Sequence, residues 1–163
     1  NKVFINFIVM PAQEINFKEN YFDLAISITC LQHIIENSKR KTALRNIYNV
    51  LEPGGILFLM ESTPNFKKKE KLIYKRERIY EKQKEECQKI GFKFIKSSGV
   101  MFVGYDLFWI LEYFLPDLIK KPFQEFFLNI CKKINLFLSK FEKISFLSNH
   151  KMLILKKIIC LRQ

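Results

Sequence analysis

The hydrophobic positions of the chain change their spacing near residue 51, from a helical pattern to a strand-like one. Leu44, Ile47, Val50 and Leu51 recur every three or four residues, which is typical of an amphipathic helix. An unbroken apolar run follows at residues 56–60 and predicts a strand that is buried on both faces.

A Pro-Gly-Gly sequence separates the two patterns. Pro53 has no backbone N–H and disfavours a helical conformation at Glu52, so the helix is expected to end there. Gly54 and Gly55 can adopt the positive φ that a tight reversal needs. A helix, a tight turn and a buried strand form half of a βαβ unit. The pattern therefore predicts a parallel sheet with helices on its faces.

The same spacing rules predict further elements along the chain. Strands are expected at residues 3–10, 21–30, 54–60, 92–100 and 150–158, and a loop at 11–17. Helices are expected at the far end of 31–51, over 67–90 with Gly91 as the stop, and over 107–141 with breaks at Pro116 and Pro122. Asn37 or Ser38 either interrupts the helical segment or caps a second helix. This alternation indicates an α/β fold.

The composition fits one packed domain, since 48% of the 163 residues are hydrophobic. The chain begins with Asn1, and Val3 already lies in an apolar run, so we expect a fragment without its N-terminal part. No uncharged window reaches the roughly 18 residues of a membrane span, and a cytoplasmic protein is expected.

The net charge of +12 suggests nucleic-acid or anionic-membrane binding in general terms. Lys, Ile, Phe and Asn are abundant together, however, which is typical of an A+T-rich coding sequence, so no specific nucleic-acid partner is predicted. The cysteines lie far apart and form no C-x-x-C pair. We expect them to be reduced packing residues and expect no metal site.

Two long segments resemble the middle of a class I S-adenosylmethionine-dependent methyltransferase. They are FDLAISITCLQHI, residues 22–34, and ALRNIYNVLEPGGILFLMES, residues 43–62. In that family a strand of the type F-D-L-x-x-S ends at the cofactor, and a helix then leads to L-x-P-G-G and a further strand. The segment 87–100 is similar to the next helix and strand of the family, and 150–157 resembles its final antiparallel strand.

The resemblance implies a Rossmann-like methyltransferase sheet and one partial methyltransferase domain over residues 1–163. Its core would be 3–100 and 150–160, with a helical insertion at 107–141. The family's Gly-rich turn and the acidic residue after its second strand are absent. Two strands and two helices would therefore be missing upstream. In the family's sheet, those two strands lie between the first and second strands expected here. The fragment would bind S-adenosyl-L-methionine poorly and be inactive.

The resemblance also implies where the cofactor lies, beyond the carboxyl ends of the parallel strands. Pro11, Ala12 and Gln13 would follow the first strand, and Ile28 and Thr29 the second. The family often has Asp where Pro11 stands, so backbone contacts would replace side-chain recognition of the adenine amine. The alternative for this loop is an ordinary strand-to-helix connection.

His33 and Glu61 are the candidate catalytic residues, because both follow strand ends on the same edge. In some family members, residues at similar positions hold or deprotonate an amine. Alternatively, His33 is a helix-start residue bonded to backbone, and Glu61 caps the next helix. Related enzymes with a metal have Glu-His, whereas Gln32 precedes His33 here.

The resemblance thus implies methyl transfer to a small-molecule or lipid-like acceptor. The alternative is a non-enzymatic basic interaction module, a membrane-surface module or a decayed fragment. Three interpretations of residues 107–141 stay open: a lid over a hydrophobic substrate, a peripheral membrane helix, or a helix packed on the sheet. The sequence predicts no oligomeric state.

Overall fold

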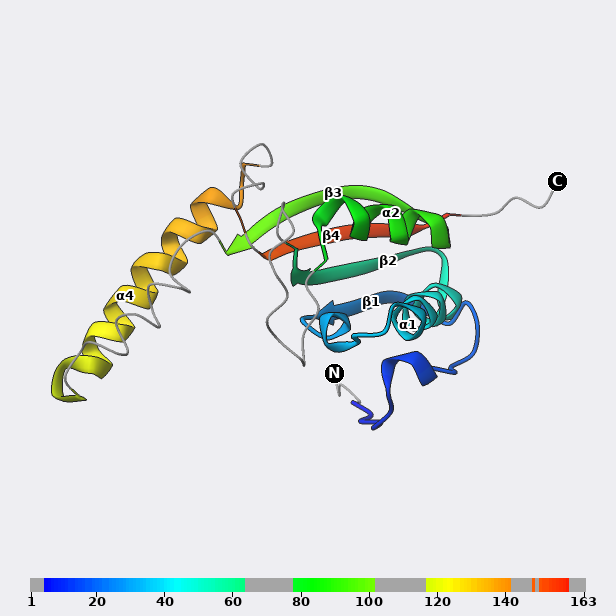
Figure 1. Cartoon of the computed structure of the whole chain (residues 1–163), viewed down its shortest axis with the longest axis horizontal. Helices are drawn as coiled ribbons and strands as arrows, with labels where there is room; N and C mark the ends of the chain where they lie inside the picture. The colour runs from blue at the N-terminus through cyan, green and yellow to red at the C-terminus, as the bar shows by residue number, and fades with distance from the viewer. Residues whose placement is uncertain (1–4, 64–77, 102–116, 142–147, 149, 159–163) are drawn as a thin grey trace, which may run out of the picture.

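The computed structural model describes residues 5–63, 78–101, 117–141, 148 and 150–158. Four strands form one sheet in the order β1-β2-β4-β3 (Figure 1). Their bounds are Phe22–Ile28 (β1), Leu51–Ser62 (β2), Phe92–Met101 (β3) and His150–Lys157 (β4). β1 and β2 are parallel, whereas β4 runs antiparallel to both of its neighbours. The α/β fold and the antiparallel last strand are confirmed.

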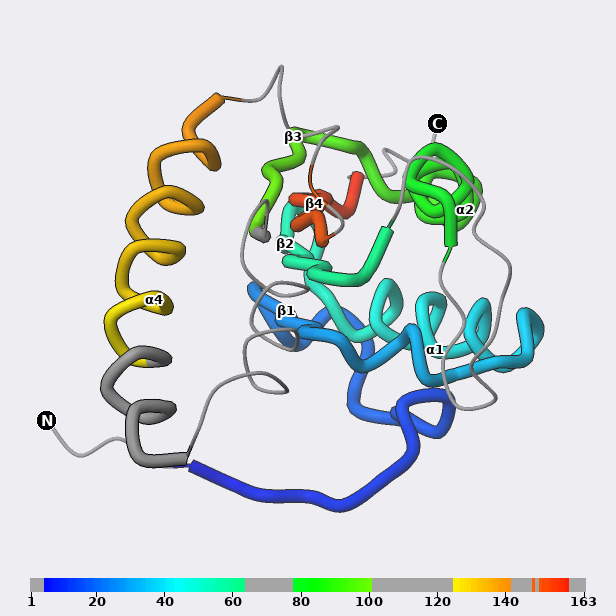
Figure 2. The backbone as a smooth tube through the Cα atoms, turned by 60° about the vertical axis from the view of Figure 1, so that its left-hand side comes forward, coloured from blue at the N-terminus to red at the C-terminus, as the bar shows by residue number. Residues whose placement is uncertain are grey.

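Within the described residues, three helices and two short 3-10 turns accompany the sheet. Their bounds are Ala12–Glu14 (η1), Leu31–His33 (η2), Asn37–Val50 (α1), Tyr80–Ile90 (α2) and Asp117–Leu138 (α4). α1 and α2 cover one side of the sheet, and α4 lies on the other side and reaches beyond the end of the strands (Figures 1 and 2). None of the described helices has both the length and the apolar character that a membrane span requires.

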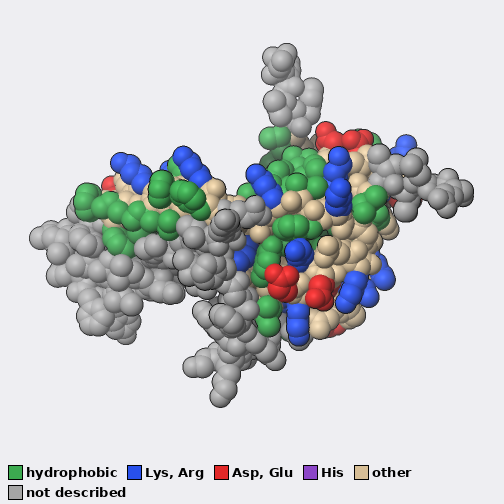
Figure 3. Space-filling view, turned by 90° about the horizontal axis from the view of Figure 1, so that it is seen from above, with side chains coloured by type: hydrophobic (Ala, Val, Ile, Leu, Met, Phe, Trp, Pro, Cys, Tyr) green, Lys and Arg blue, Asp and Glu red, His purple; other side chains and the backbone are tan. Residues whose placement is uncertain are grey.

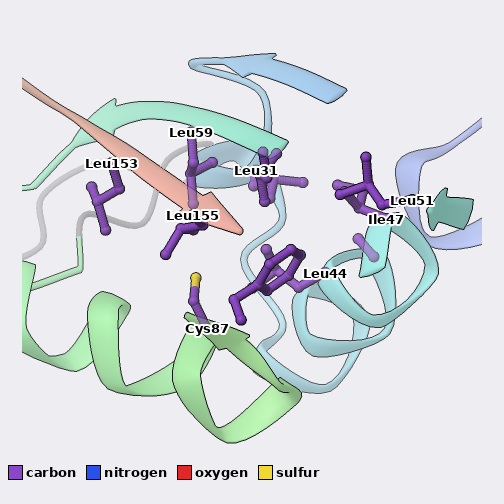
Figure 4. Packing of buried hydrophobic residues seen from close by; sticks show 11 residues of the cluster. Leu31, Leu44, Ile47, Leu51, Leu59, Cys87, Leu153 and Leu155 are labelled. Carbon is purple, nitrogen blue, oxygen red and sulfur yellow. The ribbon is translucent and has the colours of Figure 1, made fainter. Parts of the chain in front are cut away.

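The core lies between the sheet and the α1–α2 layer. Side chains from α1, β2, α2 and β4 meet there, and they include Leu44, Ile47, Leu57, Leu59, Cys87, Leu153 and Leu155 (Figure 4). The alternate residues of β2, Ile56, Phe58 and Met60, are only partly buried. The prediction of a strand buried on both faces is therefore wrong. Alternate side chains of a strand point to opposite faces, and α1 and α2 cover only one of them.

The predicted first strand is also wrong where the structure describes it. Residues 5–10 have no regular secondary structure and are mostly exposed. Among the described strands they have no hydrogen-bonded neighbour, because the sheet ends at β1. An apolar run needs such a neighbour to form a strand. Residues 3 and 4 lie outside the described residues.

Three details of the helices and cysteines correct the sequence analysis. The charged helix begins at Tyr80, since Ile79 is extended, while residues 67–77 lie outside the described residues. α4 passes through Pro122 without the predicted break, because a proline in the second turn removes only one backbone hydrogen bond. The helix ends at Leu138. Residues 107–116 are also not described. Cys87 and Cys131 are buried as expected, but Cys30 is exposed.

α1 ends at Val50 and β2 begins at Leu51, so the Pro-Gly-Gly sequence lies inside β2 and the helix ends before the predicted position at Glu52. Phe22 pairs with Leu51, but Leu24 pairs with Ile56, so the intervening residues of β2 bulge out of register. The two glycines of this bulge serve different purposes. Gly54 has a φ of +92°, whereas a Cβ on Gly55 would lie 2.9 Å from the backbone oxygen of Glu52.

We expect both glycines to contribute to stability, and Gly55 to contribute more. Gly54→Ala should lower the free energy of unfolding by about 1 kcal/mol, because only the left-handed backbone is strained. Gly55→Ala should lower it by about 2–3 kcal/mol, because backbone oxygens on two strands must move. Urea denaturation measures both, and a larger loss for Gly54→Ala would refute this assignment.

Candidate active site

The carboxyl ends of β1 and β2 lie side by side, because the two strands are parallel and Ile28 pairs with Met60. The next residue, Thr29, donates its N–H to Met60 O at 2.8 Å. Thr29 has a φ of +50°, in the left-handed region that β-branched residues rarely adopt. Such strain persists only where surrounding contacts impose it, and it is concentrated at functional sites.

Two further hydrogen bonds tie the η2 turn to the end of β2. Leu31 N–H donates to Glu61 Oε1 at 2.9 Å, and Ser62 N–H donates to Gln32 Oε1 at 3.1 Å. We call these two bonds and the Thr29–Met60 bond the strand-end clamp. Leu31, Gln32 and Glu61 are all buried. The clamp therefore fixes the loop that carries His33.

The two candidate catalytic residues lie on the same edge but in different surroundings. His33 ends the η2 turn and is exposed, with its N–H donating to Cys30 O at 3.1 Å. Its Nε2 lies 3.4 Å from Gln32 Nε2. Glu61 is buried, and its carboxylate accepts the Leu31 N–H. Of these two side chains, the one that faces solvent is that of His33.

A buried arginine lies behind the clamp and joins three elements. Arg40 of α1 is 0% exposed and forms an ion pair with Glu86 of α2. Burial raises the pKa of Glu61 to about 7, and the positive charge of Arg40 opposes this rise. Burial also lowers the pKa of Arg40. The sequence analysis missed Arg40, although it shares the apolar face of α1 with Ala43, Leu44 and Ile47.

A buried lysine closes the other side of the same edge. Lys151 of β4 pairs with Glu61 of β2 in the ladder, and its Nζ donates to Thr63 O at 2.9 Å and Ser148 O at 2.7 Å. Burial lowers the pKa of Lys151 to about 8. Lys151 lies on the same face of β4 as the buried Leu153 and Leu155, and this spacing of two residues could have indicated a buried lysine.

The loop that was predicted to meet the adenine lies against α1. Gln13 O accepts a hydrogen bond from Asn46 Nδ2 at 2.8 Å, and Ala12 packs against the core. Pro11 precedes η1 and is exposed. The structure therefore brings Ile28, Thr29, His33 and Glu61 to one edge, whereas Gln13 is bonded to α1 and Ala12 packs against the core.

No group of three or more His, Cys, Asp or Glu side chains in the described part of the chain is arranged to hold a metal ion.

Comparison with solved structures shows that this arrangement belongs to a known fold. The [4+2]-cyclase SpnF aligns with a TM-score of 0.58 and 20% identity, over 94% of this chain and 56% of its own. The 1,6-didemethyltoxoflavin-N1-methyltransferase of Burkholderia thailandensis aligns with a TM-score of 0.54 and 16% identity, over 93% and 50%. Phosphoethanolamine N-methyltransferase 2 of Haemonchus contortus aligns with a TM-score of 0.55 and 19% identity, over 90% and 36%. At these identities the likeness concerns the fold.

The sequence comparison points to the same kind of domain. The sequence model described as "Methyltransferase domain" matches residues 1–59 of the 163. This part of the chain is similar to that family, and it includes every candidate site residue except Glu61. Among the structures of similar fold, the Haemonchus enzyme is a complex with S-adenosyl-L-methionine.

The curated relatives that this chain resembles are ubiquinone/menaquinone biosynthesis C-methyltransferases, UbiE. The relative from Vibrio cholerae is 35% identical over 57 residues, which are 35% of this chain and 21% of the relative. The relative from Edwardsiella ictaluri is 36% identical over 63 residues, which are 38% of this chain and 24% of the relative. The matched part thus spans about a quarter or less of these relatives.

Proposed function

We propose that the protein transfers a methyl group from S-adenosylmethionine to a small-molecule or lipid-like acceptor. The observation that carries this proposal is the left-handed backbone of Thr29 at the carboxyl end of β1, next to the exposed His33. Open parallel sheets bind ligands beyond this edge, and a strained residue held by three clamp bonds is suited to a fixed contact with a ligand.

The residues at this edge fit one side of the cofactor. The side chain of Ile28 is 58% exposed and offers an apolar contact for an adenine or ribose ring. The backbone of Thr29 is already held in place by Met60. Pro11, Ala12 and Gln13 are the proposed second contact. When bound, S-adenosylmethionine supplies an electrophilic methyl group on its sulfonium.

His33 is the residue that we propose to face the acceptor. Its exposed imidazole would hold the nucleophile in line and accept its proton, since methyl transfer needs a neutral nucleophile and correct positioning. Glu61 is the second candidate. Because its carboxylate accepts the Leu31 N–H, it would act on the reaction by orienting the η2 turn.

The acceptor class and the domain organisation are part of the same proposal. The names of the relatives, which concern quinone biosynthesis, support a lipid-like acceptor, and the toxoflavin enzyme supports a small molecule. We propose one domain over 1–163, with its core at 3–100 and 150–160 and a helical insertion at 107–141. The pairing of β3 with β4 across this insertion supports it.

An NMR titration of the whole chain tests the proposal, because it detects weak binding and locates it. The chain has no G-x-G turn, so we expect a Kd of roughly 1 mM or weaker for S-adenosylmethionine. Additions up to about 10 mM should shift the backbone amides of Ile28, Thr29 and His33. The amide of Ile95, on β3 at the opposite edge of the sheet, should stay in place.

Two control ligands separate the proposal from its alternative. S-adenosylhomocysteine should shift the same amides as the cofactor, whereas ATP, which shares the adenosine group, should not reproduce the pattern. Unchanged amides at Ile28 and Thr29 with both sulfur ligands would contradict the proposal. That result would favour the non-enzymatic interaction module.

A further inference from the structure

α4 carries a row of exposed apolar residues that the methyltransferase site does not use. Phe126 and Phe137 are 64% and 59% exposed, and Ile130, Ile134 and Phe141 are also exposed. The spacing of the first four, three or four residues, places them along one side of the helix. Phe141 follows the end of the helix, and its ring lies 5.2 Å from that of Phe137. We call these five residues the α4 stripe.

The α4 stripe is distinct from the face that holds α4 on the body of the protein. Cys131 is buried, Phe127 is half-buried, and Ser98 Oγ of β3 donates to Ser139 O at 2.9 Å. These contacts lie on the adjoining face of the helix. The residues of the stripe therefore stay exposed when α4 packs on the body of the protein.

Basic residues lie beside the α4 stripe. At 100° per residue, Lys133 and Lys140 border the stripe on the side away from Cys131, and Lys132 lies further round. All three lysines are exposed, and Glu125 is the one acidic residue in 125–141. Figure 3 shows hydrophobic side chains gathered at the α4 end of the molecule, with basic side chains beside them.

We propose that α4 binds the surface of an anionic phospholipid bilayer. The helix would lie in the plane of the interface, with the α4 stripe at the acyl boundary and the lysines among the headgroups. Charge favours this occupant over a second copy of the chain. In a two-fold pairing of the stripes, Lys133 and Lys140 would face the same lysines of the other copy. The proposal does not depend on methyl transfer.

Co-sedimentation of the whole chain with phospholipid vesicles tests this proposal. Binding should be stronger to phosphatidylcholine vesicles that contain phosphatidylglycerol than to pure phosphatidylcholine vesicles. Phe126→Asp with Phe137→Asp should weaken it at least about tenfold, because the apolar anchor is lost. Both side chains are largely exposed, so circular dichroism should show an unchanged helix content.

A matched pair of substitutions controls for charge. Leu128 and Leu136 lie on α4 outside the stripe and are 48% and 66% exposed, so Leu128→Asp with Leu136→Asp adds the same charge at similar exposure. This control should retain most of the binding. Equal losses in the two double variants would overturn the role of the stripe.

A lysine variant tests the choice of occupant independently of the aromatic residues. Lys133→Glu with Lys140→Glu should abolish the preference for anionic vesicles, even if the aspartate variants do not fold. Binding that is equal for both vesicle types in the wild type would overturn the proposal. A wild-type dimer that Phe126→Asp with Phe137→Asp converts to monomer, without vesicle binding, would identify a second copy as the occupant instead.

Discussion

Replacing Arg40 with methionine is expected to lower the free energy of unfolding by about 3–5 kcal/mol. Arg40 is fully buried, and the substitution leaves the carboxylates of Glu61 and Glu86 without their nearby cation. Removing one partner of a buried ion pair has an effect of this size, because the remaining charge stays desolvated. Urea denaturation at pH 8, where Glu61 is largely ionised, measures it.

A matched substitution on the same helix isolates the effect of burial. Arg45 lies on the exposed side of α1, so Arg45→Met should change stability by no more than about 0.5 kcal/mol. Arg40→Met with Glu86→Leu should lose less than the sum of the two single variants, because the second change removes a stranded carboxylate. Equal stability of the Arg40→Met and Arg45→Met variants would show that the buried pair does not form.

The stability of the protein is also expected to fall as the pH rises from 4.5 to 7. Burial raises the pKa of Glu61 from 4.5 to about 7, so across this window the folded protein keeps a proton that the unfolded chain releases. The sign of the linkage therefore makes the free energy of unfolding decrease with rising pH, by about 3 kcal/mol in all. Above pH 7 this contribution is constant.

Glu61→Gln should remove this part of the pH dependence. A glutamine oxygen still accepts the Leu31 N–H, but the side chain does not titrate. Glu36→Gln is the control, because Glu36 is exposed and pairs only with the exposed Lys39. Chemical denaturation at several pH values compares the three proteins. An unchanged slope in Glu61→Gln would show that Glu61 is not the titrating group.

Local sterics made part of the fold predictable from the sequence. The change from helix to strand was predictable from Pro53, Gly54 and Gly55, whose constraints act within a few residues, although α1 ends at Val50 and β2 begins at Leu51, before Pro53. Gly91 ends α2 for the same reason, with a φ of +123°. The predicted strand over residues 5–10 was wrong because a strand also depends on a neighbouring strand, which the spacing of apolar residues along one segment does not reveal.

The site was less predictable, because its geometry comes from distant contacts. The left-handed conformation of Thr29 contradicts the preference of a β-branched residue and is held by Met60, far along the chain. Arg40 is neutralised by Glu86 on another helix. Ile28, Thr29, His33 and Glu61 lie at one edge because β1 and β2 are parallel, although β1 ends at Ile28 and β2 at Ser62, each two residues from its predicted end. The position of η1 on α1 depends on Asn46.

The place of β4 in the sheet has a consequence for the order of folding. β4 lies between β2 and β3, and among the described strands β4 is the one neighbour of β3. β1 and β2 are separated by α1 alone, so they can pair early by closing a short loop. The pairing of Leu59 with Leu153 closes a much longer loop and is expected to form later. During synthesis, β2 keeps an open edge and β3 stays undocked until residues 150–157 leave the ribosome. Insertion of β4 is then the step that joins the two halves of the sheet.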